Sequence, residues 1–336
     1  MRERWPEPMR LLTVTNMWPS PERPHWGAFV RSQVDSLVAA GVDNTLYEIE
    51  GWKGTSRYLR ALRELPDVAR ACGAELVHAH YGLSGAAALR VPLPLVVSFC
   101  GDDLLGRPDA EGRLSWKSRA LIPVSRHAAS RADQVIVKSE EMRRALPDIQ
   151  DVHVIPNGVD FSRFRARLRA EARTELGWRA DGQVLLFPAD PEEPRKNFPL
   201  AQAVEATLRA RGLDVRLEHL FGQPQERIAI AMSAADVLLL PSFHEGSPNA
   251  VKEALASGLP IVAAPVGDCE ARLRGVTPSA IAERTPGAFS EATARVLAAG
   301  TRSNGPDAVA ELSIERVAQR VLTVYRQALE HRKRAA

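Results

Sequence analysis

The chain has 336 residues, of which 45% are hydrophobic and 25% are charged, with 22 glycines and 24 prolines. This composition is typical of a folded protein of about two domains and excludes a low-complexity or disordered chain. Lys plus Arg outnumber Asp plus Glu by only 44 to 41. A general nucleic-acid-binding surface is therefore not expected, because it requires a clear positive excess.

The three cysteines, Cys72, Cys100 and Cys269, are far apart and form no CxxC pair. This spacing excludes a disulfide framework and a cysteine-based zinc site, and it favours the reducing cytoplasm. The most apolar stretch, residues 84–100, is interrupted by one arginine and two prolines, so no transmembrane helix is expected. Residues 1–10 carry charges of both signs and no apolar run, unlike a secretory signal. We therefore expect a cytoplasmic location.

Short apolar runs recur along the chain with amphipathic segments between them. The first series of runs is residues 11–15, 76–78, 95–99, 134–137 and 152–155, and the second is 184–187, 215–217, 236–240 and 260–263. The clearest helical segments are about 28–40, 116–131, 201–211 and 248–257. Because the runs are apolar on both faces, they predict parallel sheets covered by helices on both sides. The fold class predicted is α/β, with two Rossmann-like, doubly wound domains.

Turn-forming residues at 156–160 interrupt the pattern, so we predict a first domain over 1–164 and a second over 165–312. Residues 313–336 form an amphipathic helix with no strand after it. We expect this C-terminal helix to pack back on the N-terminal domain. Two such domains facing each other would leave a cleft at the carboxyl ends of their strands, where ligands bind in this architecture.

The sequence contains neither GxxxxGK[ST] nor GxGxxG, so a bound ATP or dinucleotide cofactor is not expected. The informative segment is residues 244–253, directly after the run 236–240. Ser247 suits an N-cap and Pro248 the first helical position, which predicts a helix starting there. The amides of residues 249–251 would then be available to an external anion. Glu245 and Glu253 flank this anion site, unless both are ordinary surface charges.

The chain resembles the retaining glycosyltransferases of family 4, which have two facing Rossmann-like domains in the GT-B fold. The resemblance is carried by Glu245, seven residues and Glu253, followed by Ala-Leu-Ala-Ser-Gly-Leu-Pro-Ile-Val-Ala. Residues 154–160 with Phe164 look like the family's interdomain segment, and residues 235–242 like its strand before the Glu motif. Residues 15–30 are similar to the N-terminal loop and helix of members in cell-surface polysaccharide and teichuronic acid synthesis.

The resemblance implies that the first domain binds an acceptor and the second a nucleotide diphosphate sugar, a UDP- or GDP-sugar above all. It implies that Glu253 accepts hydrogen bonds from the donor ribose and that Glu245 contacts the transferred sugar near its anomeric carbon. Other donor-binding groups would be Gly246, Ser247, Asn249, Ala250 and Val251. Transfer would occur with retention and without a protein nucleophile.

Arg195 and Lys196 are implied to neutralise the leaving diphosphate, so a metal ion is not required. The sequence departs from the family here, because Pro191 stands where an arginine is usual five residues before the lysine. Lys196 is the firmer assignment, and Arg195 is a candidate replacement for the missing guanidinium. The alternative is a solvated Arg–Lys pair.

In the first domain, Gly27 lacks a Cβ and would let a diphosphate approach the backbone, unless it simply forms a tight turn. Asp102 and Asp103 either line the acceptor side or fix their loop, and Cys100 stands where the family often has a histidine. His78 and His80 would share one face of a strand. His80 could reach the cleft, but metal binding would need a third ligand that the sequence does not identify.

Lys and Arg outnumber Asp and Glu between residues 107 and 144. The helix expected at 116–131 could therefore contact anionic lipid at the inner face of the membrane, which would suit a lipid-linked hydroxyl acceptor; otherwise it is a solvated helix face. Two rival functions remain. One is a sugar-nucleotide epimerase of GT-B-like fold, and the other is a non-catalytic sugar-binding protein.

Overall fold

The computed structural model describes residues 8–107 and 113–335, which form two compact units. Among the described residues, the first unit contains 8–107, 114–158 and 314–335, and the second contains Val159–Ser313. The units meet in sequence between Gly158 and Val159, a few residues before the boundary that the sequence suggests. Val159 and Phe164 are the reason, because both are buried in the core of the second unit.

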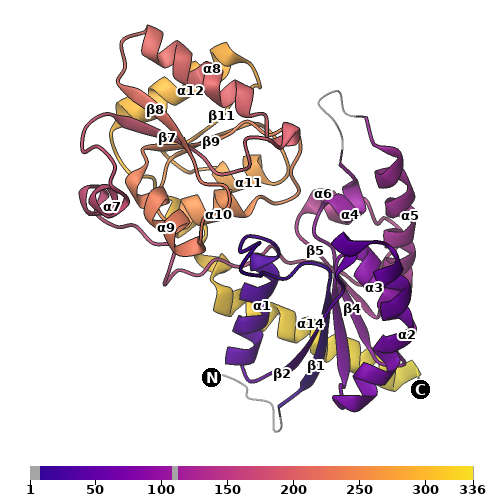
Figure 1. Ribbon diagram of the computed structural model, residues 1–336. Coiled ribbons are helices and arrows are strands. Elements are labelled where there is room, and N and C mark those ends of the chain that lie inside the picture. Colours follow the sequence, from indigo (N-terminus) through magenta and orange to yellow (C-terminus); the bar gives the residue numbers. More distant parts are fainter. Residues whose placement is uncertain (1–7, 108–112, 336) are drawn as a thin grey trace. The chain divides into compact units, whose positions relative to one another are not determined.

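The first unit is a six-stranded parallel sheet in the order β2-β1-β3-β4-β5-β6 (Figure 1). Its strands are β1 (Arg10–Thr15), β2 (Asp43–Glu48), β3 (Leu76–His80), β4 (Leu95–Ser98), β5 (Gln134–Val137) and β6 (Val152–Val154). Its α-helices are α1 (Ala28–Ala39), α2 (Ser56–Ala71), α3 (Gly82–Ala88), α4 (Asp102–Leu105), α5 (Trp116–Arg131), α6 (Glu140–Arg144) and α14 (Ile314–Ala335). The central strands β3, β4 and β5 are buried along their whole length, as continuous apolar runs predict.

The C-terminal helix α14 belongs to the first unit and covers one face of its sheet together with α1. Val317, Val321 and Tyr325 of α14 pack in one cluster with Leu76 and Val96 of the sheet. A second cluster on the sheet contains apolar residues of α2, α3 and α5. The sheet is thus enclosed on both faces, and its carboxyl-end edge is where polar residues gather.

The second unit is a five-stranded parallel sheet in the order β11-β10-β9-β7-β8. Its strands are β7 (Gln183–Phe187), β8 (Val215–His219), β9 (Val237–Leu240), β10 (Ile261–Ala263) and β11 (Ala280–Ile281). Its α-helices are α7 (Arg169–Leu176), α8 (Phe198–Ala210), α9 (Gln225–Ala234), α10 (Asn249–Ala256), α11 (Cys269–Leu273), α12 (Pro286–Ala299) and α13 (Gly305–Ala308). The chain runs from β7 to one side and then the other, so the strand order reverses between β7 and β9. Ligands bind at such a reversal in doubly wound sheets.

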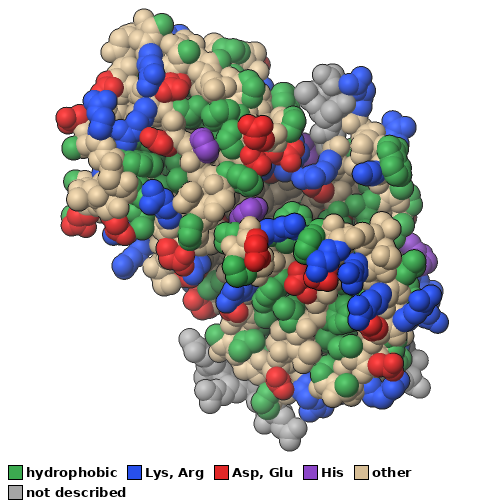
Figure 2. Space-filling view, in the orientation of Figure 1, with side chains coloured by type: hydrophobic (Ala, Val, Ile, Leu, Met, Phe, Trp, Pro, Cys, Tyr) green, Lys and Arg blue, Asp and Glu red, His purple; other side chains and the backbone are tan. Residues whose placement is uncertain are grey.

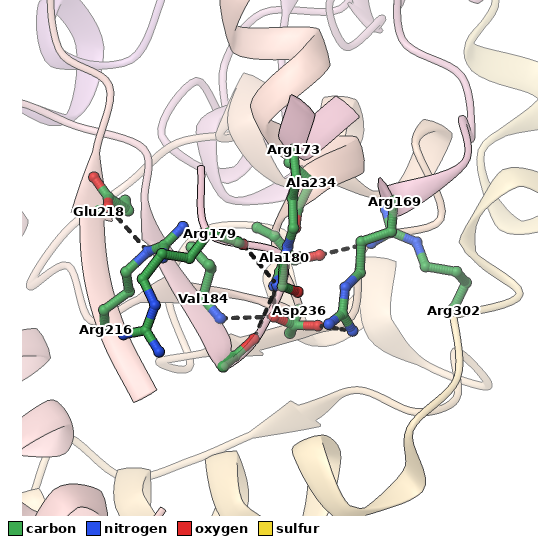
Figure 3. Close-up of polar contacts among 12 residues, drawn as sticks. Arg169, Arg173, Arg179, Ala180, Val184, Arg216, Glu218, Ala234, Asp236 and Arg302 are labelled. Atoms are coloured by element: carbon green, nitrogen blue, oxygen red, sulfur yellow. Dashed lines mark hydrogen bonds and ion pairs between the residues drawn. The ribbon is translucent and has the colours of Figure 1, made fainter. Parts of the chain in front are cut away.

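A network of arginines fixes the opposite, amino-end edge of the second sheet (Figure 3). The Asp236 carboxylate, just before β9, accepts bonds from Arg173 Nη2 at 2.8 Å, Arg169 Nη1 at 2.7 Å and the Val184 amide at 2.6 Å. Arg173 is only 1% exposed and also donates to backbone carbonyl oxygens, including that of Ala180 at 2.6 Å. This network joins β7 and β9 at the amino ends of the two strands.

On the face in view in Figure 2, acidic and basic side chains lie intermixed on each unit. None of the helices formed by the described residues is both long and apolar enough to cross a lipid bilayer.

Candidate functional site

Three charged side chains of the second unit meet at the carboxyl ends of β7 and β9. Lys196 Nζ lies 2.7 Å from Glu245 Oε1, and Arg195 Nη1 lies 3.3 Å from Glu245 Oε2. Arg195 Nη1 also donates to the carbonyl oxygen of His244 at 2.8 Å. The two loops are joined through the backbone, because the Phe243 amide donates to the Arg195 carbonyl oxygen at 2.9 Å. Arg195 and Lys196 are therefore partly buried ion-pair partners of Glu245, and not a solvated pair.

The charge state of this cluster follows from its packing. Burial raises the pKa of Glu245, but Lys196 and then Arg195 more than offset it, so the pKa lies below its ordinary value. Glu245 is consequently an anion throughout the neutral range, suited to accept hydrogen bonds and unsuited to donate a proton. Arg195 Nε and His244 Nε2 are buried with no hydrogen-bond partner among the described residues. Such groups at a strand-order reversal are what a polar ligand would satisfy.

The helix after Glu245 begins later than the sequence predicts. It is α10, which starts at Asn249 and follows Pro248, whose extended ψ of 122° excludes it from the helix. Ser247 is not the N-cap: its hydroxyl donates to Asp268 Oδ2 at 2.8 Å and accepts from Lys252 Nζ at 3.1 Å. Within the described residues no side chain caps α10.

Lys252 is a residue of this site that the sequence analysis missed. It is 1% exposed, and its ammonium contacts both the hydroxyl and, at 3.4 Å, the carbonyl oxygen of Ser247. Arg272 joins the same network by donating to Asp268 Oδ2 at 3.0 Å. A lysine one position before a motif glutamate is a visible signal, but its partners are fixed only by the fold.

The loop before α10 and the first turn of this helix contain the other predicted donor-binding residues. Val251 is completely buried in the core, while Asn249 and Ala250 are partly exposed. The backbone of Gly267 packs closely against Gly246, because a Cβ on Gly267 would lie 2.5 Å from the Gly246 carbonyl oxygen. The loop before α10 is therefore held from two sides. The anion-binding role of the amides of residues 249–251 stays a prediction.

Glu253, four residues after the start of α10, is half-buried, and its carboxylate has no hydrogen bond or ion pair among the described residues. Burial raises its pKa to about 7, although Lys252 and Arg163 act in the opposite direction. The two carboxylates of the motif thus differ in character. Glu245 is ionised and paired, whereas Glu253 lacks a partner and titrates near neutral pH.

In the first unit, Gly27 precedes α1 with a left-handed φ of 72°. A Cβ there would lie 2.3 Å from the Met17 carbonyl oxygen, so both the conformation and the space require glycine. This close approach is to the protein's own backbone. It supports the tight-turn alternative for Gly27 and leaves the approach of a diphosphate a prediction.

His78 and His80 lie on one face of β3, with their ring centroids 4.1 Å apart. His78 bonds to the Tyr325 hydroxyl at 2.6 Å and to the Ser98 hydroxyl at 2.8 Å, so it joins β3, β4 and α14. His80 is also buried, and both of its ring nitrogens have no partner in the described part of the chain. His78 is structural, while His80 has unused hydrogen-bonding capacity.

Asp103 fixes the loop after β4. Its carboxylate accepts the amides of Gly82 at 2.9 Å, Cys100 at 3.0 Å and Gly101 at 2.9 Å, and the residue is completely buried. This favours the loop-fixing alternative and leaves Asp103 no exposed oxygen for an acceptor. Asp102 is partly exposed and forms an ion pair with Arg107 at 2.6 Å. Within residues 8–107 and 113–335, no three His, Cys, Asp or Glu side chains are arranged to hold a metal ion.

Two models of glycosyltransferase families match parts of the chain. The model of Glycosyltransferase Family 4 matches residues 18–163, and the model of Glycosyl transferases group 1 matches residues 189–299. The chain is a glycosyltransferase that resembles family 4 in both halves. The matches fall on the two sheets in turn, and the second contains the whole Arg195–Glu253 region.

Relatives of this glycosyltransferase share its sequence at low identity. It is 25% identical to TuaC of Bacillus subtilis, named as a teichuronic acid biosynthesis glycosyltransferase, over 77% of this chain and 82% of that one. It is 28% identical to the D-inositol 3-phosphate glycosyltransferase of Frankia alni, over 66% of this chain and 65% of that one.

Solved structures share the fold. Sucrose-phosphate synthase of Thermosynechococcus elongatus superimposes with a TM-score of 0.79 at 20% identity, over 95% of this chain and 98% of that one. HepE of Anabaena in complex with UDP gives a TM-score of 0.67 at 15% identity, over 94% and 99%. The predicted α/β class and the GT-B fold are confirmed, as is the resemblance to family 4.

Proposed function

We propose that this glycosyltransferase moves a sugar from a nucleoside diphosphate sugar to a hydroxyl group, with retention of anomeric configuration, in the synthesis of a cell-surface polysaccharide or glycoconjugate. UDP-sugars are the first donors to test, because the structure of HepE that shares this fold is a complex with UDP. The cell-surface role is supported by the similarity to TuaC.

The observation that carries this proposal is the pair of unlike carboxylates, Glu245 and Glu253, at the strand-order reversal of the second sheet. Glu253 is a half-buried acceptor without a partner, which suits the two hydroxyls of a ribose. Glu245 is ionised and held in place by Arg195 and Lys196, which suits a hydroxyl of the transferred sugar. These are the roles that family 4 assigns to the matching positions.

The reaction then needs little acid–base chemistry from the protein. The bond between the anomeric carbon and the donor diphosphate breaks, and the acceptor oxygen forms the new bond on the same face of the sugar. The acceptor proton passes to an oxygen of the departing diphosphate, so no protein nucleophile or base is used. Arg195, Lys196 and the amides at the start of α10 stabilise the charge that develops on the diphosphate.

The two rival functions make different demands on the site. An epimerase would need groups that add and remove protons around the sugar ring, and it would convert the donor without an acceptor. A non-catalytic sugar-binding protein would not need a cation pair placed for a leaving diphosphate. Removal of the Glu253 carboxylate with no change in donor affinity would favour the non-catalytic protein.

The experiment is a thermal-shift panel of UDP-, GDP- and ADP-sugars, followed by proton NMR of the reaction with the donor that stabilises the protein. A bound donor raises the melting temperature by mass action. We expect one nucleotide class to stabilise the wild type, and Lys196→Met and Glu253→Gln to lose most of that effect. Lys333→Met, at an exposed position of α14, is the matched control. A product of inverted configuration, or epimerisation of donor alone, would contradict the proposal.

Peripheral attachment to an anionic membrane is part of the proposal. Helix α5 carries Lys117, Arg119 and Arg126, and the indole of Trp116 at its start is 75% exposed. A tryptophan next to basic residues is typical of helices that lie at a membrane surface. Such attachment at the inner face would bring the enzyme to a lipid-linked acceptor in the cytoplasm.

A further inference from the structure

A cluster of polar residues lies at the carboxyl ends of the three central strands of the first unit. His80 ends β3, and it is in register with Ser98 of β4, which is in register with Ile136 of β5. Cys100 and Lys138 come two residues after Ser98 and Ile136, just beyond the ends of β4 and β5. The charge of Lys138 acts on both His80 and Cys100, so the three side chains lie near one another at this edge of the sheet. The strand order reverses between β1 and β3, next to this cluster.

Lys138 is a buried cation without a partner. It is 2% exposed and its Nζ has no hydrogen-bond partner in the described part of the chain. Burial lowers the pKa of Lys138, and the nearby carboxylate of Asp103 offsets this only in part. The oxygens of Asp103 are already taken by three backbone amides. An unpaired buried charge is costly, and proteins that keep one usually use it.

His80 adds two more unused groups beside Lys138. Burial, and then the charge of Lys138, lower the pKa of His80 to about 3, so the ring is neutral and offers one donor and one acceptor. Burial lowers the pKa of Lys138 to about 8, which leaves it predominantly protonated at neutral pH. The pair therefore presents a positive charge and a hydrogen-bond donor to any ligand.

Two segments next to these groups are unusual: there is empty space beside Gly101, and the backbone at Tyr81 is strained. Gly101 is buried, yet a Cβ added there would meet no heavy atom within 4 Å outside its chain neighbours. Tyr81, directly after His80, has a φ of 83° and a ψ of 141°, a region that non-glycine residues rarely occupy. Strain of this kind persists where the surrounding structure imposes it, and it concentrates at functional sites.

We infer that Lys138 and His80 bind an oxyanion carried by the acceptor, either a phosphate or a carboxylate. This deepens the proposed function, on which it rests for the statement that the first unit receives the acceptor. An uncharged sugar would satisfy the ring nitrogens of His80 and leave the ammonium of Lys138 unpaired. An oxyanion satisfies the ammonium and accepts from the imidazole N–H as well.

The test uses the full chain and small probes in matched pairs. The probes are D-inositol 3-phosphate against myo-inositol, D-glucuronate against D-glucose, and UDP alone. The readout is the NMR titration of the Lys138 side chain, assigned by its absence in Lys138→Met. We expect at least one oxyanion probe to raise the pKa of Lys138 and its uncharged counterpart to leave it unchanged. The probe that acts distinguishes a phosphate from a carboxylate.

Calorimetric titration of the active probe gives the second measurement. We expect Lys138→Met to weaken its binding about tenfold or more, and Lys333→Met, which removes the same charge from an exposed position of α14, to leave it unchanged. Because methionine fills a buried lysine position without a charge, Lys138→Met should melt no lower than the wild type. If Lys138→Met melts lower than the wild type, and Lys138 of the wild type responds to no oxyanion probe, then Lys138 is a structural residue. That result would overturn the inference.

UDP separates this inference from the proposed function. If UDP shifts Lys138 as strongly as the acceptor probes, the site serves the donor diphosphate and the acceptor assignment is overturned. Donor binding is measured separately with Lys196→Met and Glu253→Gln in the second unit. If no nucleotide sugar stabilises the protein while an oxyanion probe still raises the pKa of Lys138, the proposed glycosyl transfer is contradicted. The oxyanion site is then retained.

Discussion

Lys196 and Glu245 are 49 positions apart in the chain, and their side chains meet at 2.7 Å across the ends of two neighbouring strands. Glu245 is thereby both ionised and immobilised. In the proposed complex, the cation would face the leaving diphosphate and the anion would face a hydroxyl of the transferred sugar.

Removing the Lys196 ammonium should slow glycosyl transfer. Lys196→Met takes away a charge that stabilises the leaving diphosphate, so we expect kcat/KM to fall by about 10²–10³. Steady-state kinetics with the donor selected by the thermal-shift panel measures this. Lys333→Met is the control, and unchanged kinetics in Lys196→Met would assign the diphosphate to other residues.

Donor affinity should depend on the ionisation of Glu253. Its raised pKa of about 7 means that sugar hydroxyls, which donate to the carboxylate, bind better as the pH rises through 7. A nucleotide sugar has no group of its own that titrates there, so the dependence belongs to the protein. Calorimetric titration across neutral pH should show tighter binding at high pH for wild type and a flat profile for Glu253→Gln. A pH-dependent Glu253→Gln would assign the titration to another group.

The same residue should cost stability. The folded pKa of Glu253 lies above its ordinary value of 4.5, so the unfolded chain releases this proton first as the pH rises. The penalty therefore accumulates between about pH 4.5 and pH 7 and is complete above that range. Glu253→Gln should melt higher than the wild type at pH 8, with a smaller difference near pH 5. Equal melting differences at both pH values would argue against a buried, unpartnered carboxylate.

Ser247 should act through Lys252 and Asp268 and not as a helix cap. Ser247→Ala leaves both of these groups short of a partner, so we expect a loss of about 1–2 kcal/mol in stability and weaker donor binding. Urea unfolding and donor titration measure the two effects. Ser247→Thr keeps the hydroxyl and should restore both. An alanine variant identical to the wild type would remove Ser247 from the site.

Asp236 should matter for stability alone. Asp236→Asn leaves Arg173 buried without its ion pair, and breaking such a pair costs about 3–5 kcal/mol. Because the network lies at the other end of β9 from Glu245, donor affinity measured well below the melting temperature should not change. Asp214→Asn, at an exposed pair with Arg179, is the matched control and should cost little.

Trp116 should contribute to membrane attachment. Co-sedimentation with vesicles of anionic and of neutral lipid measures it, and we expect Trp116→Ser to reduce binding to the anionic vesicles without altering donor binding. Salt should weaken the attachment, because exposed charges are screened. Equal sedimentation of the wild type and Trp116→Ser with anionic vesicles would place α5 away from the membrane.

The sequence predicts the sheets well, for a physical reason. Runs such as residues 134–137 are apolar on both faces because helices cover both faces of the strand, and they are recognisable without the fold. The edge strands β2 and β11 escape this rule. β2 is polar and partly exposed, and β11 is two residues long.

The site is less predictable because its contacts are distant in sequence. A local rule makes Ser247 an N-cap, but its hydroxyl is taken by Asp268, 21 positions away. Alternation along β3 indicates that His78 and His80 share a face, yet nothing local indicates that His78 meets Tyr325 of the last helix. Lys138 carries no motif at all, and only its burial without a partner makes it a candidate.

The most direct test is a crystal structure of the protein with the selected nucleotide sugar. We expect diphosphate oxygens on Lys196 and the amides at the start of α10, with the ribose hydroxyls on Glu253. A nucleotide bound elsewhere, with these groups unchanged, would contradict the account.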